Sequence, residues 1–229
     1  MAWKILLCIL LGYLVGGINP AYIIGTLRGF DIRKKGSGNA GASNAIITMG
    51  KRVGVISALL DIFKATAVML IAPLFLKVPF AAEIAGVSCI IGHVFPAFMK
   101  FRGGKGLACM GGMLLAIDWR LFFVMFTAEV ILLLLVDYIC FVPITASVLI
   151  PIIYGAFGSA GAGTLINANG GWWGAAIIAA GTLVVFGKHI ENLKRIRHGV
   201  ELHFSFLWSK NKEAEIERVR KNHESRIGK

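Results

Sequence analysis

The sequence lacks the polar surface that a soluble domain of its length would need. Of its 229 residues, 57% are hydrophobic and only 16% are charged, and the mean hydropathy is +0.75. Between the charged segments run apolar stretches that reach the roughly 20 residues a helix needs to cross a bilayer. The alternating pattern of membrane β-barrel strands is missing. We therefore expect an all-α, polytopic integral membrane protein.

Cysteine is scarce and is not arranged for disulfides or for metal binding. Cys8, Cys89, Cys109 and Cys140 all fall in apolar stretches and have no paired spacing, which is typical of small buried side chains. Clustered acidic residues are lacking too, so we expect neither a metal nor another cofactor. The first apolar run has no small-residue cleavage site, which favours a retained first helix over a removed signal peptide.

Positive charge is plentiful but confined to three segments. Six of the 24 Lys and Arg residues lie in 28–52, three in 99–106 and eleven in 188–229. Such clusters mark the cytoplasmic side of membrane proteins, so these segments are expected to face the cytoplasm. The net charge of +12 is explained by this pattern and gives no reason to expect nucleic acid as a partner. The clusters also suit anionic lipid or an anionic substrate.

The apolar stretches and the charge clusters predict seven transmembrane helices, with the N-terminus outside and the C-terminus in the cytoplasm. Their expected positions are 3–27, 53–76, 81–98, 107–117, 120–138, 142–158 and 172–188. Five spans are the alternative, if the fourth and fifth helices are re-entrant or merged. Gly16-Gly17 and Asn19-Pro20 should interrupt the first helix. Residues 1–207 are expected to form one membrane domain and 208–229 a charged tail, while the uncharged loop 159–171 suits the external side.

The loop 28–52 contains the stretch Gly36-Ser37-Gly38-Asn39-Ala40-Gly41-Ala42-Ser43-Asn44. Glycine lets backbone N–H groups turn toward one point, and Ser and Asn add side-chain donors. The stretch holds no acidic residue, and cations such as Arg52 flank it. This composition suits a bound phosphate. Taken alone, however, it is more often a flexible connection between helices.

Two further segments bring polar side chains to the same predicted membrane face. The first combines His93 with Gly103-Gly104-Lys105-Gly106, whose backbone can approach a ligand closely. The second holds His189, Asn192 and Arg195, which are spaced by three residues and share a helix face. Singly, Lys105 is explained as a cytoplasmic charge and each histidine as a structural hydrogen-bonding group. Three such segments on one face together predict a site.

These motifs resemble those of the bacterial acyl-phosphate:glycerol-3-phosphate acyltransferase family, which are small multi-span membrane enzymes. Residues 36–44 match Gly-Ser-Gly-Asn-x-Gly-x-Thr-Asn, with Ser43 in the Thr position. The second family motif, Gly-His-x-Phe-Pro followed by Phe-Lys/Arg-Gly-Gly-Lys-Gly, is matched within 92–106. The third, basic-His-x-x-Asn-Ile/Leu-x-Arg followed by Gly-x-Glu, is matched within 188–201. The resemblance covers residues 1 to about 207.

The family's second helix also carries an Asp and a Lys, similar to Asp61 and Lys64 here. These two residues lie three apart on one helix face, and charges inside a membrane are costly unless they are paired. We expect an internal salt bridge and prefer it to a catalytic role.

The resemblance implies transfer of an acyl chain from acyl phosphate to the 1-hydroxyl of sn-glycerol 3-phosphate. The product is lysophosphatidic acid, in the first step of phospholipid synthesis. It further implies the bacterial inner membrane as location, a cytoplasmic active site and membrane lipid as surroundings. As a partner it implies the phosphate acyltransferase that makes acyl phosphate.

The donor is already activated, so a covalent acyl-enzyme is unnecessary, and the sequence has neither a nucleophile elbow nor a His with an Asp four residues on. We expect Ser37, Lys105 and His189 to be catalytic, with His189 or a substrate phosphate oxygen as the base. Substrate binding is expected from Gly36, Gly38, Asn39, Gly41, Ser43, Asn44, Arg52, His93, Gly103, Gly104, Asn192 and Arg195.

One position departs from the family pattern. The Arg expected three residues after the first motif is Ile47 here, so Arg52, Lys51 or another cation would have to replace its charge. Two other functions remain open: a transporter or channel for an organic phosphate, and a non-catalytic membrane scaffold. A transporter would bring polar residues to the midplane from both sides and have two similar halves. Polar motifs on one side only favour the enzyme.

Overall fold

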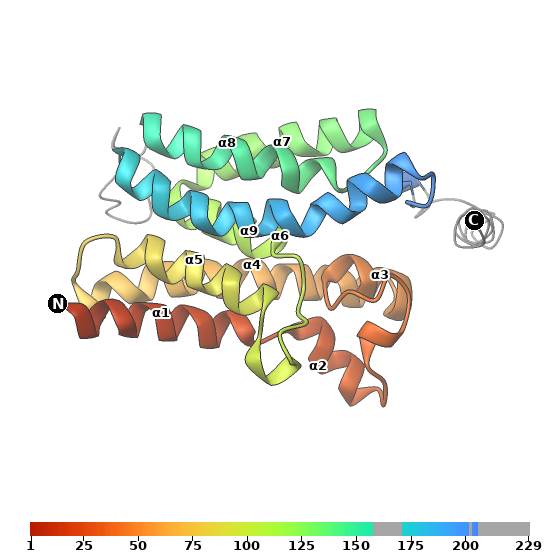
Figure 1. Ribbon diagram of the computed structural model, residues 1–229, viewed down its shortest axis with the longest axis horizontal. Coiled ribbons are helices and arrows are strands. Elements are labelled where there is room, and N and C mark those ends of the chain that lie inside the picture. Colours follow the sequence, from red (N-terminus) through yellow and green to blue (C-terminus); the bar gives the residue numbers. More distant parts are fainter. Residues whose placement is uncertain (158–170, 202, 206–229) are drawn as a thin grey trace.

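The computed structural model describes residues 1–157, 171–201 and 203–205. Within these ranges the chain is helical and contains no strand, which confirms the all-α expectation (Figure 1). The helices are α1 (Ala2–Gly17), α2 (Pro20–Leu27), α3 (Ala42–Met49), α4 (Lys51–Leu76), α5 (Ala81–Val94), α6 (Leu107–Ile117), α7 (Trp119–Val136), α8 (Phe141–Phe157) and α9 (Gly171–Arg197), with 3-10 turns η1 (Ile32–Lys34) and η2 (Ala97–Met99). The loop 159–171 and the tail 208–229 fall almost entirely outside the described residues.

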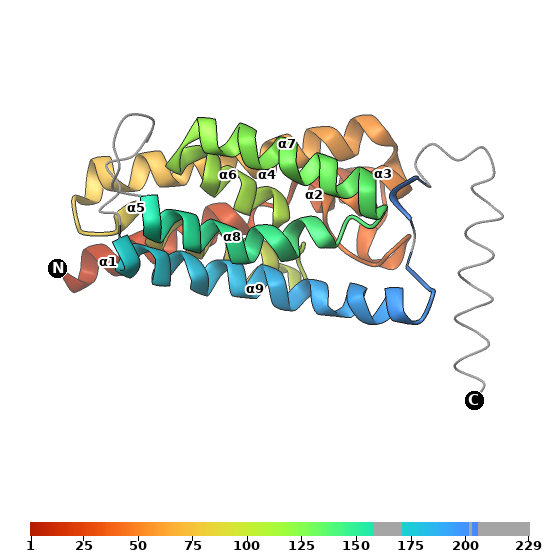
Figure 2. The ribbon, with the colours of Figure 1, turned by 90° about the horizontal axis from the view of Figure 1, so that it is seen from above.

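The long helices run side by side along the long axis of the molecule (Figures 1 and 2). Helix α5 is central and packs against α1, α4, α6 and α9. The N-terminus and the turn 77–80 lie at one end of the bundle, whereas α2, α3 and the C-terminal end of α9 lie at the other (Figure 1). We call this second end the polar end, because all three sequence motifs approach it.

Small residues allow α1 and α5 to pack with their backbones in contact. A side chain added at Gly12 or Gly16 of α1 would collide with the backbone of α5 at Ala85 or Cys89. Gly92 of α5 lies in the same way against the carbonyl of Tyr13. Such close approach is common between membrane helices, where it maximises van der Waals contact.

The first apolar run is broken where the sequence predicts an interruption. Asn19 caps α2 by accepting a hydrogen bond from the amide of Tyr22 at 2.9 Å, and Pro20 occupies the first helical position. Helices α1 and α2 meet at an angle of 41°. The expected single helix 3–27 is therefore two helices.

The loop 28–52 is more structured than expected. It contains η1 and the two-turn helix α3, so Ser43 and Asn44 lie in a helix and not in a loop. Gly50, with φ of +94°, separates α3 from α4. Because α3 has only eight residues, it is too short to stand out as a span in the hydropathy pattern.

In the part of the chain that the structure describes, four helices are long and apolar enough to cross a membrane: α4, α5 extended through η2, α7 and α9. The bent pair of α1 and α2 makes a fifth if it counts as one span. Helices α6 and α8 are apolar but have only 11 and 17 residues. Large apolar side chains such as Phe63, Phe126 and Leu135 are exposed on the outside of the bundle, as expected for a surface that faces lipid.

Candidate active site

The glycine-rich loop is folded around the side chain of Asn44. The Asn44 amide oxygen accepts from the backbone of Ser37 at 2.8 Å, and its nitrogen lies 2.8 to 3.0 Å from the carbonyls of Ile32, Lys35 and Asn39. Asn44 is fully buried. Gly36 has a φ of +58° and leaves no room for a side chain beside the Asn44 amide, which explains the glycine at this position. Asn44 thus holds the loop in shape.

Two residues outside the motif attach this loop to the rest of the polar end. Asn19 is fully buried and donates to the carbonyl of Ala40 at 2.9 Å. Arg33 pairs with Asp31 at 2.7 Å and donates to the carbonyl of Met99 at 2.7 Å, in η2. The hydrogen bond from Arg33 lowers the pKa of Asp31. Arg33 is therefore a structural link between the first and second motifs.

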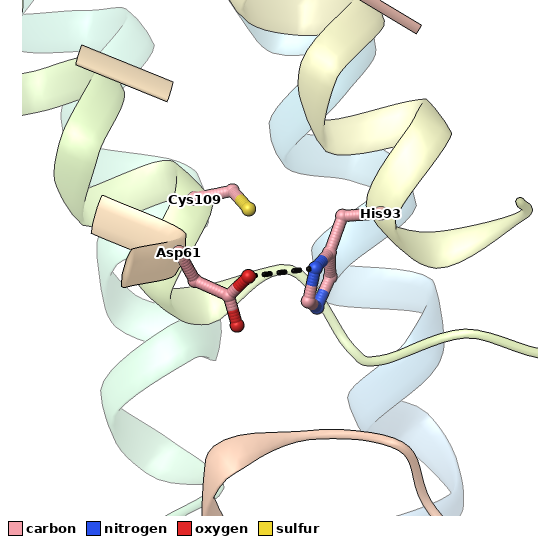
Figure 3. Close-up of side chains that lie close together, drawn as sticks. All are labelled: Asp61, His93 and Cys109. Atoms are coloured by element: carbon pink, nitrogen blue, oxygen red, sulfur yellow. Dashed lines mark ion pairs between the residues drawn. The ribbon is translucent and has the colours of Figure 1, made fainter. Parts of the chain in front are cut away.

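The second motif lies against a buried cluster of charged side chains. The Asp61 carboxylate forms an ion pair with the Lys64 ammonium at 2.6 Å. It also lies 3.3 Å from Nδ1 of His93 (Figure 3). The Lys64 ammonium also lies 3.1 Å from Nδ1 of His93. Gly104 packs directly on the other ring nitrogen of His93 and donates its N–H to the His93 carbonyl at 3.0 Å. The predicted salt bridge is confirmed, and it includes a histidine of the second motif.

Asp61, His93 and Cys109 also present atoms of the kinds that bind metals, all within 4.8 Å of one another (Figure 3). The Lys64 ammonium, however, is already within ion-pair distance of the Asp61 carboxylate. A divalent cation would have to displace this buried positive charge or be repelled by it. The arrangement favours an ion-pair cluster over a metal site.

The second and third motifs meet at Lys105. Its ammonium donates to the side-chain oxygen of Asn192, whose nitrogen in turn donates to Glu201 at 2.6 Å. Burial lowers the pKa of Lys105, and Arg195 adds to that effect, whereas the Glu201 carboxylate opposes it. A partly desolvated ammonium, held by a neutral amide, remains able to attract an anion strongly.

His189 lies one turn before Asn192 on α9 and is buried. Its Nδ1 is 2.8 Å from the carbonyl of Val185, so Nδ1 carries the hydrogen and donates. The other ring nitrogen, Nε2, is left as an acceptor. This tautomer suits a group that takes up a proton.

The remaining predicted polar side chains are more exposed. Ser37, Ser43 and Arg52 are exposed, and Asn39 is half-buried. Arg195 is partly exposed and pairs at 2.8 Å with Glu191, one turn earlier on α9. The residues thus form three groups: the loop around Asn44, the His93 cluster, and Lys105 with Asn192 and Glu201. The structural roles of Asn19 and Arg33 depend on contacts across the fold, and only the Asn19-Pro20 pair gave a sequence signal.

An apolar groove of about 560 Å³ lies away from these groups, between α1, α5 and α9. It is lined by Ile9, Phe80, Ile84, Val87, Ser88, Trp173, Ala176, Ile177 and Ala180. Phe80 and Trp173 place it toward the end opposite the polar end. It includes none of the predicted site residues, and its lining suits hydrocarbon.

The fold and the polar end together define a helical membrane protein with a site suited to anions. Comparison with known proteins gives the family. A family model described as "Glycerol-3-phosphate acyltransferase" matches residues 6–199, and the chain belongs to this family.

Relatives and solved structures agree with this assignment. The glycerol-3-phosphate acyltransferase of Brucella canis is 36% identical over 194 residues, which cover 84% of this chain and 90% of the relative. Glycerol-3-phosphate acyltransferase 1 of Oceanobacillus iheyensis is 34% identical over 211 residues, 88% of this chain and 95% of the relative. The crystal structure of PlsY (YgiH), an integral membrane glycerol 3-phosphate acyltransferase, in its glycerol 3-phosphate form has a TM-score of 0.74 at 29% identity, over 89% of this chain and 96% of that chain.

Proposed function

We propose that this protein transfers an acyl chain from an acyl phosphate to the 1-hydroxyl of sn-glycerol 3-phosphate, giving lysophosphatidic acid and inorganic phosphate. The observation that carries the proposal is the hydrogen-bonded series from Lys105 through Asn192 to Glu201. It joins two motifs distant in sequence and leaves an ammonium near His189 at the polar end. Both substrates are anions, and such a group supports their binding.

In this proposal Lys105 and Arg195 bind phosphate, while Asn192 and His189 orient the glycerol 3-phosphate. Lys105 is buried enough for its charge to act through little water. Arg195 is partly exposed and pairs with Glu191 at 2.8 Å, so a phosphate would compete with that carboxylate for the guanidinium.

The glycine-rich loop receives the acyl-phosphate head. Ser37 and Asn39, with the backbone of Gly38 and Gly41, orient the donor phosphate or the oxyanion that forms on the acyl carbonyl. The loop is held in one shape by Asn44, which favours such a preorganised role. The acyl tail extends between helices into the lipid.

The reaction needs no covalent intermediate on the protein. The glycerol hydroxyl oxygen attacks the acyl carbonyl carbon, and the bond from that carbon to the phosphate oxygen breaks. The hydroxyl proton passes to Nε2 of His189 or to a phosphate oxygen of a substrate. Positioning of two bound anions, together with stabilisation of the developing charge, supplies the rate enhancement.

For the membrane arrangement we propose seven spans in the bacterial inner membrane, with the N-terminus outside and the polar end in the cytoplasm. Helices α1, α4, α5, α6, α7, α8 and α9 would be these spans, within a single acyltransferase domain of residues 1–207. The clustering of Lys and Arg supports this orientation. The enzyme that makes acyl phosphate would work on the same cytoplasmic side.

Site-directed labelling tests this topology. The native cysteines are all buried, so an introduced cysteine is the main target of a membrane-impermeant maleimide. Lys34→Cys should react only from the cytoplasmic side and Lys77→Cys only from the outside. The opposite pattern would overturn the orientation.

The activity is tested with the purified protein reconstituted into vesicles. Palmitoyl phosphate and radiolabelled glycerol 3-phosphate should give labelled lysophosphatidate and phosphate, whereas palmitoyl-CoA in place of palmitoyl phosphate should not. Lys105→Ala and His189→Ala should each abolish product formation, and Lys4→Ala, at the other end of the bundle, should not. Uptake of glycerol 3-phosphate without product would instead identify a transporter.

A further inference from the structure

A polar cluster joins the end of α7 to the segment that follows α9. Asp137 ends α7 with a φ of +61°. Its carboxylate accepts from both the N–H and the hydroxyl of Ser205, each at 2.7 Å, and its carbonyl accepts from the N–H of Phe204 at 2.7 Å. Asp137 thus accepts three hydrogen bonds from a segment that lies up to 68 residues later in the sequence.

His203 completes this cluster. Its Nδ1 lies 3.1 Å from the Asp137 carboxylate, and its Nε2 lies 3.2 Å from the Tyr138 hydroxyl. The rings of His203 and Tyr138 also lie 4.5 Å apart, centroid to centroid. We call Asp137, Tyr138, His203 and Ser205 the Asp137 clasp. Four residues that satisfy one another's hydrogen bonds fix a chain segment more firmly than packing of an exposed loop would.

The clasped segment carries Glu201, the last member of the series that holds Lys105. On one side of Glu201 the chain is fixed to α9, because Val200 donates to the carbonyl of Arg195 at 2.9 Å. On the other side it is fixed by the Asp137 clasp. The Glu201 carboxylate then accepts from Asn192 at 2.6 Å, and the Asn192 oxygen faces Lys105.

We propose that Asp137 is a positioning residue: by holding Ser205 and His203 it keeps Glu201 on Asn192, and so keeps the Asn192 oxygen turned toward Lys105. This inference rests on the proposed acyl transfer, in which Lys105 binds phosphate. Asp137 itself touches neither substrate. Its carboxylate acts on Lys105 indirectly. It holds Ser205 and His203 in place, and the Glu201 side chain that precedes them holds Asn192.

Release of the segment has a specific electrostatic consequence. The groups that act on Lys105 are Glu201, Arg195 and Glu191 of α9, and Cys140 before α8. His189 of α9 also lies near enough for the Lys105 ammonium to act on it. Of the two carboxylates, Glu201 counteracts the effect of burial the more strongly. If Glu201 moves away, the pKa of Lys105 falls further, so the ammonium is lost at a lower pH. The loss of activity at alkaline pH should then begin at a lower pH than in the wild type.

The chain offers a matched control on the same helix. Asp118 caps the N-terminal end of α7, where its carboxylate accepts from the amides of Arg120 at 2.8 Å and Leu121 at 3.2 Å. Like Asp137 it is a partly exposed aspartate at an end of α7. Asp118→Ala therefore removes comparable hydrogen bonds without any link to Glu201.

The experiment compares Asp137→Ala, Asp137→Asn and Asp118→Ala in vesicles, with palmitoyl phosphate and glycerol 3-phosphate, as a function of pH. Asp137→Ala should lower kcat/KM about tenfold, the equivalent of one weakened hydrogen bond to a charged group, and should move the alkaline decline to lower pH. Asp137→Asn can still form a hydrogen bond with Ser205, so its kcat/KM and the pH of its alkaline decline should lie between those of the wild type and Asp137→Ala. Asp118→Ala should keep the wild-type pH profile.

Each outcome decides the matter. An alkaline decline at the wild-type pH in Asp137→Ala, even with reduced activity, would show a merely structural role and overturn the inference. If Asp137→Ala does not fold, the pH profile of Asp137→Asn decides by the same criterion. Wild-type activity in Lys105→Ala would instead contradict the proposed function, which keeps the two failures distinguishable.

Discussion

The ammonium of Lys64 lies 2.6 Å from the carboxylate of Asp61, one turn earlier on α4, and both side chains are buried. The same ammonium donates to the carbonyl oxygens of Gly16 at 2.9 Å and Ile18 at 2.6 Å. These carbonyls lie at the end of α1, where backbone oxygens have no helical partner. The ion pair therefore also holds the bend between α1 and α2.

Lys64→Met should destabilise the protein severely. The substitution leaves the Asp61 carboxylate buried without its lysine, which costs about 3–5 kcal/mol of unfolding free energy. Adding Asp61→Asn removes the uncompensated charge and should restore part of the loss. Unfolding of the purified variants in mixed micelles, followed by tryptophan fluorescence, measures both. A single variant as stable as the wild type would contradict the role of the pair.

Asn44→Asp should lower kcat/KM at least about tenfold. The new carboxylate can still accept from Ser37, but it cannot donate to the three backbone carbonyls that Asn44 contacts. Each buried polar group left without a partner costs about 1–3 kcal/mol. Without these hydrogen bonds the glycine-rich loop should become more flexible. Protease cleavage within 35–42 should therefore be faster than in the wild type. Unchanged cleavage and unchanged kinetics would show that the loop keeps its shape without this side chain.

Gly104→Ala should lower activity by about an order of magnitude or more, because a steric clash in the site displaces groups that the reaction needs. The added methyl group would overlap Nε2 of His93, so either the loop or the His93 cluster must shift. Gly111→Ala is the control, since the nearest atom to its new methyl group is a Phe122 carbon at 3.6 Å. It should be as active as the wild type and up to about 1 kcal/mol more stable. Equal activities of the two variants would contradict the tight fit of Gly104.

The alkaline decline in activity should follow the charge of Lys105. Its pKa lies below that of an exposed lysine because of burial, so the ammonium is present below that pKa and disappears as the pH rises through it. Lys105→Arg should shift the decline upward, since a guanidinium stays charged, although its different shape should lower kcat. If the wild type and Lys105→Arg lost activity at the same pH, the decline would have to reflect the titration of another group.

The positions of the long helices follow from the sequence, because apolar length is a strong signal in a membrane protein. The break at Asn19-Pro20 was also predictable, since capping and a missing N–H act locally. Helix α3 was not, because its two turns are too short for a hydropathy signal and depend on packing against α4, where Ile46 lies on Gly54.

The site could be predicted as a set of motifs but not as a set of contacts. Loop composition indicated an anion site, yet nothing local shows that Asn44 turns inward. The links from Asn19 to Ala40 and from Arg33 to Met99 join residues 21 and 66 positions apart. Such contacts are set by how the helices pack, and the helix pattern alone does not specify them.

Ile47→Arg tests how the first motif handles the charge that it lacks. Ile47 lies on α3, one turn after Asn44, and 40% of it is exposed, so an arginine can extend from it without displacing the core. The KM for glycerol 3-phosphate should stay the same or fall by up to about tenfold, the value of one charge-assisted hydrogen bond. Ile47→Gln, with a long but uncharged side chain, is the control and should not lower KM. Severe loss in a folded Ile47→Arg, with Ile47→Gln still active, would mean that a positive charge at this position disrupts the bound anions, and that Arg52 or another cation already supplies what the phosphate requires.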